Sequence, residues 1–271
     1  MTTASGLSLA ARAFDAVADS FDERFTPWLS VAAQRRAVRR ELLGAFAPGA
    51  SVIDIGGGTG LDAAWLEARG RRVLLTDPAP RMISSAARKL GKDRVQLVGA
   101  EDLGSLTSSF GDMAFDGAYS NFAALNCVSD LDAFARGLAR LLKPGAPTLL
   151  VVFGIFCPAE FVVEIARGRY RNVFRRLNRS EAPARLAGQD FSIHYHRGAE
   201  LRAALAPWFD YRSRRAVGLF VPPSAAEPWI SRHARMLSIL ERLDRPLSRA
   251  LAALGDHVLY RFERSQAPVA R

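Results

Sequence analysis

Residues 52–60 read Val52-Ile53-Asp54-Ile55-Gly56-Gly57-Gly58-Thr59-Gly60, and this stretch decides the fold. Its first four residues form a short, mostly apolar run that is typical of a buried strand. The glycines that follow predict a sharp turn into a helix, which ends near Gly70. A strand, a glycine turn and a helix in this order let a nucleoside lie close to the backbone. The stretch therefore predicts an α/β domain with a nucleoside site at the turn.

The same alternation of strands and helices continues on both sides of this stretch. Strands are expected at 51–55, 72–76, 95–98, 115–120 and 148–153, and helices at 31–46, 61–69, 80–90 and 131–142. Strands that alternate with helices at this spacing indicate an α/β fold with a parallel, doubly wound sheet. In such sheets the ligand binds at the carboxyl ends of the strands.

The alternation breaks after residue 153. We expect an arginine-rich helical stretch at 158–188, an extended segment at 191–195 and a helix at 199–205. A strand at 209–220, one or two helices at 226–254 and a last strand at 257–263 should follow. There is no internal repeat or long linker, so residues 1–271 are interpreted as a single domain. Its core is 50–154, and 155–254 form a helical cap that recognises the substrate.

Length and composition exclude several classes of protein. The chain has 271 residues, 49% hydrophobic and 24% charged, which is ordinary for a folded domain. Its longest uncharged stretch, 144–159, contains three prolines and is shorter than the ~20 apolar residues of a membrane span. The N-terminus lacks the pattern of a signal peptide. The two cysteines, Cys127 and Cys157, provide no disulfide framework, and a cytoplasmic location is expected.

The net charge of +10 is unevenly distributed along the chain. Residues 1–150 carry 17 basic and 16 acidic side chains, whereas residues 151–271 carry 20 and 11. Of the 37 basic residues 34 are arginines, as a GC-rich coding bias would produce without selection for polyanions. The excess of positive charge therefore lies outside the part of the chain that carries the motifs.

Two aspartates indicate which nucleoside is bound. Gly58-x-Gly60-x-x-Ala63 satisfies the dinucleotide fingerprint, but Asp54 at the mouth of the loop would repel a pyrophosphate. A carboxylate there suits a cationic ligand such as S-adenosylmethionine, which carries an ammonium and a sulfonium and no phosphate. Asp77, at the end of the second strand, is placed to accept hydrogen bonds from ribose hydroxyls.

In these motifs the chain resembles the class I S-adenosylmethionine-dependent methyltransferases, small-molecule branch, from about Phe14 to Phe153. The resemblance implies a mostly parallel seven-stranded sheet with an antiparallel last strand at 255–264, and N-terminal lid helices at 1–46. It implies S-adenosylmethionine as cofactor and S-adenosylhomocysteine as product. The cofactor-binding residues expected are Asp54, Gly56, Gly57, Gly58, Gly60, Asp77, Pro78, Met82, Ala100, Glu101, Asp102, Ser120 and Asn121. Gly99 departs from the pattern, because many relatives have an aspartate there for the adenine amino group.

The substrate side offers weaker signals. His194, His196 and Tyr119 are the candidate catalytic residues, and a histidine base would favour an oxygen acceptor over nitrogen. The alternative is a surface strand with two solvated imidazoles. No third ligand accompanies the histidine pair, so no metal site is expected. The candidate substrate residues are Phe21, Asn126, Tyr195 and Trp229, and the predicted apolar pocket comprises Phe156, Phe161, Trp208, Phe220 and Trp229.

The sequence predicts methyl transfer to an oxygen or nitrogen atom of a small or medium-sized apolar, aromatic or acyl metabolite. A carrier-protein-bound acid or a lipid is the alternative substrate, since the basic second half can attract an acyl carrier protein or an anionic lipid surface. An NAD-dependent oxidoreductase and a catalytically silent partner subunit stay open as other classes. Nucleic acid is not expected, because no nucleic-acid module is appended. A monomer or homodimer is expected.

Overall fold

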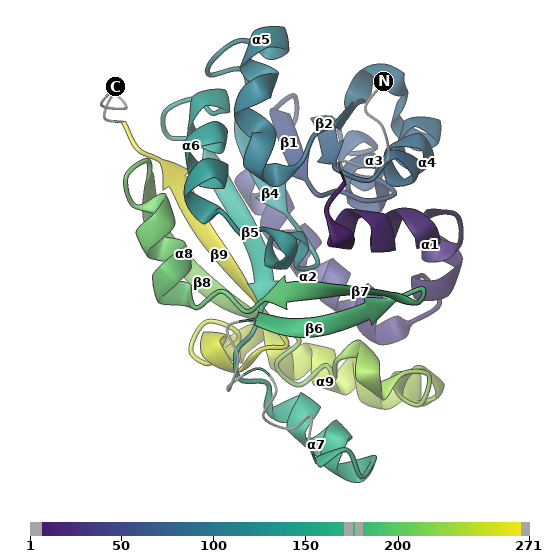
Figure 1. Cartoon of the computed structure of the whole chain (residues 1–271). Helices are drawn as coiled ribbons and strands as arrows, with labels where there is room; N and C mark the ends of the chain where they lie inside the picture. The colour runs from purple at the N-terminus through teal and green to yellow at the C-terminus, as the bar shows by residue number, and fades with distance from the viewer. Residues whose placement is uncertain (1–6, 171–175, 177–180, 267–271) are drawn as a thin grey trace.

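The computed structural model describes residues 7–170, 176 and 181–266 (Figure 1). Its main elements are, in chain order, α1 (Leu9–Phe25), α2 (Leu29–Ala45), β1 (Ser51–Ile55), α3 (Leu61–Glu67), β2 (Arg72–Asp77), α4 (Pro80–Leu90), β3 (Val95–Leu97), the 3-10 helix η3 (Ala100–Leu106), α5 (Thr107–Phe110), β4 (Gly117–Ser120), the 3-10 helix η4 (Ala124–Cys127), α6 (Leu131–Leu141), β5 (Pro147–Phe153), α7 (Pro158–Ala166), β6 (Glu181–Leu186), β7 (Gln189–His194), α8 (Gly198–Leu205), β8 (Phe209–Val217), α9 (Ala234–Leu247) and β9 (His257–Arg264).

Seven strands form the central sheet in the order β3-β2-β1-β4-β5-β9-β8. Strands β1 to β5 are parallel, whereas β9 is antiparallel to both β5 and β8. Ile55 pairs with Thr76, so the carboxyl ends of β1 and β2 lie side by side. The predicted doubly wound, mostly parallel sheet with an antiparallel last strand is confirmed.

Helices cover both faces of the sheet and give two cores. On one face α6 and α8 bury Phe134, Leu138 and Leu201 with η3. On the other face α3, α4 and α2 pack against the strands, where α2 contributes Leu42 and is followed by the buried Phe46. The predicted lid at 1–46 is therefore wrong for its second half. Because the apolar side of α2 faces the sheet, only α1 is free to lie across the carboxyl edge (Figure 1).

The segment after β5 differs most from its sequence-based prediction. Among the described residues of the expected helical stretch 158–188, the α-helix covers only 158–166, and residues 171–175 and 177–180 lie outside the described part of the chain. Strand β6 instead pairs with β7 in a hairpin, whose two-residue turn Ala187-Gly188 has φ values of 49° and 78°. Positive φ at both positions suits the right-handed twist of a tight hairpin. In addition, α8 and β8 belong to the sheet layers, so the cap comprises α7, the hairpin and residues 218–254.

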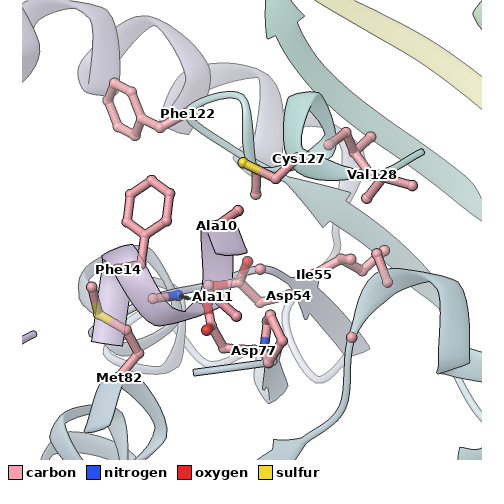
Figure 2. Close-up of a pocket in the computed structure, with 18 of the residues that line it drawn as sticks. Ala10, Ala11, Phe14, Asp54, Ile55, Asp77, Met82, Phe122, Cys127 and Val128 are labelled. Carbon is pink, nitrogen blue, oxygen red and sulfur yellow. Dashed lines mark hydrogen bonds between the residues drawn. The ribbon is translucent and has the colours of Figure 1, made fainter. Parts of the chain in front are cut away.

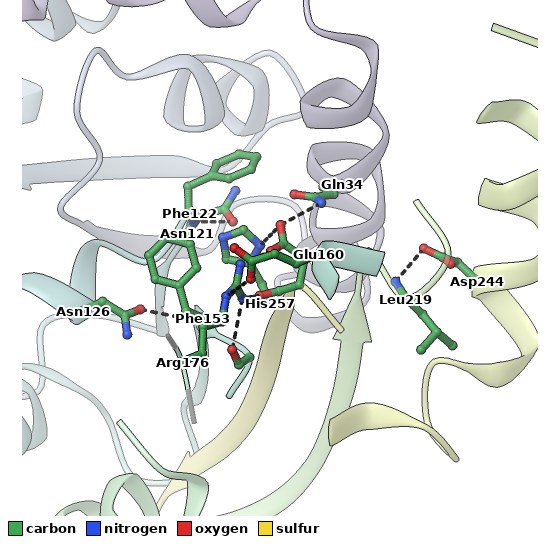
Figure 3. A network of polar contacts seen from close by, with 12 residues as sticks. Gln34, Asn121, Phe122, Asn126, Phe153, Glu160, Arg176, Leu219, Asp244 and His257 are labelled. Carbon is green, nitrogen blue, oxygen red and sulfur yellow. Dashed lines mark hydrogen bonds and ion pairs between the residues drawn. The ribbon is translucent and has the colours of Figure 1, made fainter. Parts of the chain in front are cut away.

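A buried polar network fixes the start of the cap to the sheet (Figure 3). Arg176 is 5% exposed, and its Nη1 donates to the carbonyls of Gly154 (3.0 Å) and Asp256 (2.8 Å). Its guanidinium also pairs with the carboxylates of Glu160 and Asp256. Gln34 of α2 donates to Asp256 from the other side, at 3.1 Å. The network thus joins the ends of β5 and β9 to α7 and α2.

Candidate active site

The glycine loop after β1 forms the floor of the site. The amides of Gly56 and Gly57 donate to the Thr76 carbonyl at 2.8 and 3.1 Å, which brings the loop against the end of β2. A Cβ on Gly57 would lie 2.6 Å from both Asp54 Oδ2 and the Leu75 side chain, so a larger residue would displace these two side chains. Gly58 has a φ of 57°, a left-handed conformation that favours glycine.

Asp77 lies at the end of β2 and faces this loop. Its Oδ2 accepts from the Gly58 amide at 3.0 Å, and its Oδ1 accepts from the Ala79 amide at 2.9 Å. Burial raises the pKa of Asp77 to about 6, although the two amide hydrogen bonds oppose this shift. At neutral pH the carboxylate is therefore ionised and has lone pairs left for donors in the cavity.

Asp54 is the most unusual group in the site, because it is 2% exposed and still lines the cavity. Its Oδ2 has no hydrogen-bond partner among the described residues, and the Tyr119 hydroxyl lies beside the carboxylate. Burial raises the pKa of Asp54 well above its usual range. An unpartnered carboxylate in such a place favours a cationic ligand, which would return it to the ionised form.

A cavity of about 640 Å³ opens above these residues, which is ample for a small-molecule site (Figure 2). Helix α1 covers it with Ala10, Ala11 and Phe14, and the turn after β4 adds Phe122 from the opposite side. The hairpin packs on the back of α1, where Phe191 meets Phe14 at a ring distance of 5.9 Å. The cavity is thus enclosed by α1, and α1 is held in place by the hairpin.

Most of the predicted cofactor-binding residues line this cavity. Besides the two aspartates these are Gly56, Gly57, Gly58, Pro78, Met82, Ala100, Glu101, Asp102 and Asn121. Glu101 has a second task, because its Oε1 accepts from the amides of Ser129 and Asp130 at 2.8 and 2.7 Å. Gly60 and Ser120 do not line the cavity. Gly60 precedes α3 with a φ of 82°, and the Ser120 hydroxyl donates to the Ile55 carbonyl at 2.9 Å.

Two residues of the site, an arginine and an aspartate, were not predicted from the sequence. Asp62, in the first turn of α3, pairs with Arg35 at 3.0 Å and with Arg39 at 2.7 Å. Asn121 Nδ2 donates to the same carboxylate at 2.7 Å. The Arg35 guanidinium lies 4.6 Å from the centre of the Phe122 ring and lines the cavity. The only available signal was the spacing of Arg35 and Arg39, four residues apart on a helix.

The three predicted catalytic side chains do not reach the cavity. His196 is buried, and its Nε2 lies 3.1 Å from the carbonyls of both Leu125 and Val128, so it fastens the η4 turn to the end of the hairpin. Burial lowers its pKa. His194 stacks on His196 and is absent from the cavity wall. Tyr119 is fully buried against Phe46 on the α2 face. The prediction of a histidine base at the acceptor is therefore wrong.

Of the predicted substrate residues only Phe21 lines the cavity. Asn126 is fully buried and bridges two segments, because it donates to the His194 carbonyl and accepts from the Phe153 amide. Tyr195 packs on Phe153, and Trp229 is 53% exposed beside His233.

The predicted aromatic pocket is also wrong. Phe156 contacts Phe161, and Trp208 packs on the core of the α6 face. With Trp229 exposed, these side chains lie in separate places and none of them lines the cavity. The cavity takes its aromatic side chains from α1 and from the turn after β4 instead.

The wall chemistry fits S-adenosylmethionine. Asp54 offers an unpartnered carboxylate oxygen for an ammonium, and Arg35 offers a cation for a carboxylate. Asp77 suits ribose hydroxyls, while Pro78, Met82 and Leu97 supply apolar contacts for a flat base. Within the described residues no group of three or more His, Cys, Asp or Glu side chains is arranged to hold a metal ion.

Comparison with known proteins agrees with this geometry. A family model described as a methyltransferase domain matches residues 53–150. The cypemycin N-terminal methyltransferase of a Streptomyces species is 30% identical over 218 residues, which cover 72% of this chain and 84% of the relative. A demethylmenaquinone methyltransferase of Tropheryma whipplei is 34% identical over 166 residues, which cover 60% of this chain and 66% of the relative.

A solved structure supports the fold. A putative S-adenosylmethionine-dependent methyltransferase from Listeria monocytogenes superposes with a TM-score of 0.58 at 18% identity, covering 87% of this chain and 98% of that one. The order of the strands, the glycine loop with its two aspartates and the relatives all agree. The chain belongs to the class I S-adenosylmethionine-dependent methyltransferases.

Proposed function

We propose that this methyltransferase acts on an oxygen or nitrogen atom of a small or medium-sized apolar, aromatic or acyl metabolite. One observation carries the proposal, namely that a single covered cavity contains both the glycine loop and an apolar wall. Phe14, Phe21 and Phe122 belong to that wall. S-adenosylmethionine, when bound, supplies a methyl group that its sulfonium has already activated.

The residues of this chain then have to orient and enclose the reactants. Asp54, Asp77 and Arg35 bind the polar ends of the cofactor, and α1 excludes water from above. The Phe122 ring is held into the cavity by a backbone turn in which Phe122 and Ala123 have φ values of 49° and 60°. Such strained turns are found where a side chain has to be aimed at a ligand.

The wall favours neither oxygen nor nitrogen as the acceptor. An oxygen acceptor with an ordinary hydroxyl needs a base, but burial raises the pKa of Cys127 to about 11. Asp77 has a pKa of about 6, but two backbone amides hold its carboxylate, so it is not free to take a proton from the acceptor. We therefore infer an acceptor that arrives as a neutral amine or as an oxygen that is already ionised.

The test is a screen for S-adenosylhomocysteine formation with amines, phenols and carboxylic acids, the acids both free and bound to an acyl carrier protein. Phe122→Ala should lower turnover of the accepted class at least tenfold while changing cofactor affinity little. Phe161→Ala is the matched control, because Phe161 lies outside the cavity and its loss should leave turnover unchanged. Turnover that depends on Phe161 and not on Phe122 would place the acceptor elsewhere.

A carrier-bound acid is the second candidate, because residues 151–271 carry 20 basic and 11 acidic side chains and such an excess attracts acidic partners. Activity on the carrier-bound acid alone, with none on the free acid, would select this candidate. A catalytically silent subunit predicts no product with any acceptor. A monomer or homodimer and a cytoplasmic location stay predictions.

A further inference from the structure

The cap separates its charges in an unusual way. Residues 155–170 and 221–254 contain five acidic side chains, and none of them is exposed: Glu160, Glu164, Glu227, Glu241 and Asp244. Each of the last three serves an internal contact. Glu227 accepts from Ser30 at 2.6 Å, Glu241 pairs with Arg36 at 2.7 Å, and Asp244 accepts from the Phe220 amide at 2.6 Å.

The arginines of the same segments point outward. Those on or next to α9 are Arg232, Arg235, Arg242, Arg245 and Arg249, all exposed, and Arg169 follows α7. Across the described residues, none of these arginines has an acidic partner within 4 Å. The outer surface of α7 and α9 is therefore basic, without exposed carboxylates to neutralise it. We call this surface the basic face.

Large apolar side chains are exposed on the same face. Ile239, Leu243 and Leu247 recur every four residues on α9 and are 57%, 46% and 38% exposed. Residues four apart lie on one side of a helix, so they form a stripe. Leu237 of the same helix is buried in a small core with Ile230. Nothing described in the chain covers the stripe.

Helix α7 extends this apolar surface. Its Val163 packs against the same small core as Leu237, while Val162 and Ile165 are 68% and 50% exposed. Figure 1 shows α7 and α9 together at one end of the molecule, below the hairpin. Because α7 follows the carboxyl end of β5, this is the edge of the sheet at which the cavity lies.

We propose that the basic face binds reversibly to the surface of an anionic lipid bilayer, where α9 lies in the plane of the headgroups. Arginines attract lipid phosphates, and exposed Ile and Leu side chains enter the boundary between headgroups and acyl chains. Binding of an acidic protein would require only the arginines. The exposed apolar stripe favours lipid instead, because a bilayer also offers an apolar layer for these side chains. No described helix is long and apolar enough to cross a membrane.

The test is co-sedimentation of the full chain with vesicles of phosphatidylcholine, with and without 30% phosphatidylglycerol. We expect binding to the anionic vesicles only, weakened by 0.5 M salt because the charges are solvent-exposed. Arg235→Gln with Arg242→Gln should weaken binding about 25-fold, that is about fivefold for each charge. Ile239→Ser with Leu243→Ser should weaken it at 0.5 M salt as well, since the apolar contribution is not screened.

Arg88→Gln with Arg136→Gln is the matched control, because both arginines are exposed and lie on α4 and α6. This pair should change vesicle binding less than threefold. No binding to anionic vesicles at low salt would overturn the proposal, as would equal losses in the control pair and in the α9 pair. Binding of a purified acidic acyl carrier protein through Arg235 and Arg242, without vesicle binding, would also overturn it. The readout requires no methyl transfer, so it is independent of the proposed function.

Discussion

Asp77 allows a sharp test of cofactor recognition, because both its oxygens already have defined partners. One accepts from the Gly58 amide and the other from the Ala79 amide, at 3.0 and 2.9 Å. The remaining lone pairs face a cavity in which only a ligand or water can donate to them. Asp77→Ala removes these acceptors without adding bulk. Asp77→Asn is no milder, since its NH₂ would have to face one of the two amides.

The expected magnitude follows from the bonds that are lost. A hydrogen bond to a charged group contributes about 1.5–3 kcal/mol in a buried site, so Asp77→Ala should weaken S-adenosylmethionine binding about 10- to 150-fold. The pH dependence has a definite sign. Because the pKa of Asp77 is about 6, the carboxylate loses its charge as the pH falls through 6. Affinity should therefore fall about tenfold between pH 8 and pH 5.

The assay is calorimetric titration of S-adenosylmethionine, S-adenosylhomocysteine and NAD at pH 8, 6.5 and 5, on the unaltered chain and on Asp77→Ala. The decline should be smaller in the variant, because Asp54 is then the remaining carboxylate with a raised pKa that is assigned to the cofactor. Asp132→Ala, on the exposed start of α6, is the matched control and should bind as the unaltered chain does. A loss of less than threefold in Asp77→Ala would refute the assignment of Asp77 to the ribose. Binding of NAD would instead contradict the role of Asp54 in selecting S-adenosylmethionine.

Three other side chains have predictable effects. Burial raises the pKa of Asp54 in the folded chain above its value in the unfolded chain. The contribution of Asp54 to the stability of the fold is therefore fully present below the pKa of the unfolded chain and is lost as the pH rises. Asp54→Asn should therefore raise the melting temperature of the ligand-free chain at pH 8 more than at pH 5, and weaken cofactor binding at least tenfold by calorimetry. His196→Ala should lower the free energy of unfolding by about 1–3 kcal/mol in urea titrations, because two buried carbonyls lose their donor. A base lost from the acceptor site would instead abolish turnover at unchanged stability. Arg176→Met should lower the free energy of unfolding, measured by thermal unfolding, by about 3–5 kcal/mol, because Asp256 stays buried without the guanidinium that pairs with it. A change below about 1 kcal/mol would show that the network is solvated.

The parts of the site that could be predicted are those in which a few consecutive residues determine the geometry. The glycine loop follows β1 directly, and Asp77 ends the strand that pairs with β1. Parallel pairing alone brings these two loops together at one edge. The sequence contained all the information needed, because no contact with a distant segment alters where they lie.

Arg35 and Asp62 show the limit of such reasoning. Each is an ordinary helical residue in its own segment, 27 positions apart along the chain. Their pairing arises because the apolar side of α2 packs on the sheet beside α3, which turns Arg35 toward the cavity. No local pattern distinguishes this arginine from the many others in the chain.

His194 and His196 show the converse case, in which a sequence pattern suggests a catalytic role that the fold does not give these residues. An alternating strand places residues 194 and 196 on one face, so the pattern itself is equally compatible with a catalytic pair and with a buried anchor. What decides is the position of η4, about 70 residues earlier, whose Leu125 and Val128 carbonyls need a donor once they are buried. His196 supplies that donor and is thereby removed from the cavity. Burial of backbone carbonyls therefore explains why the residue most suggestive of a base in the sequence is a structural residue in the fold.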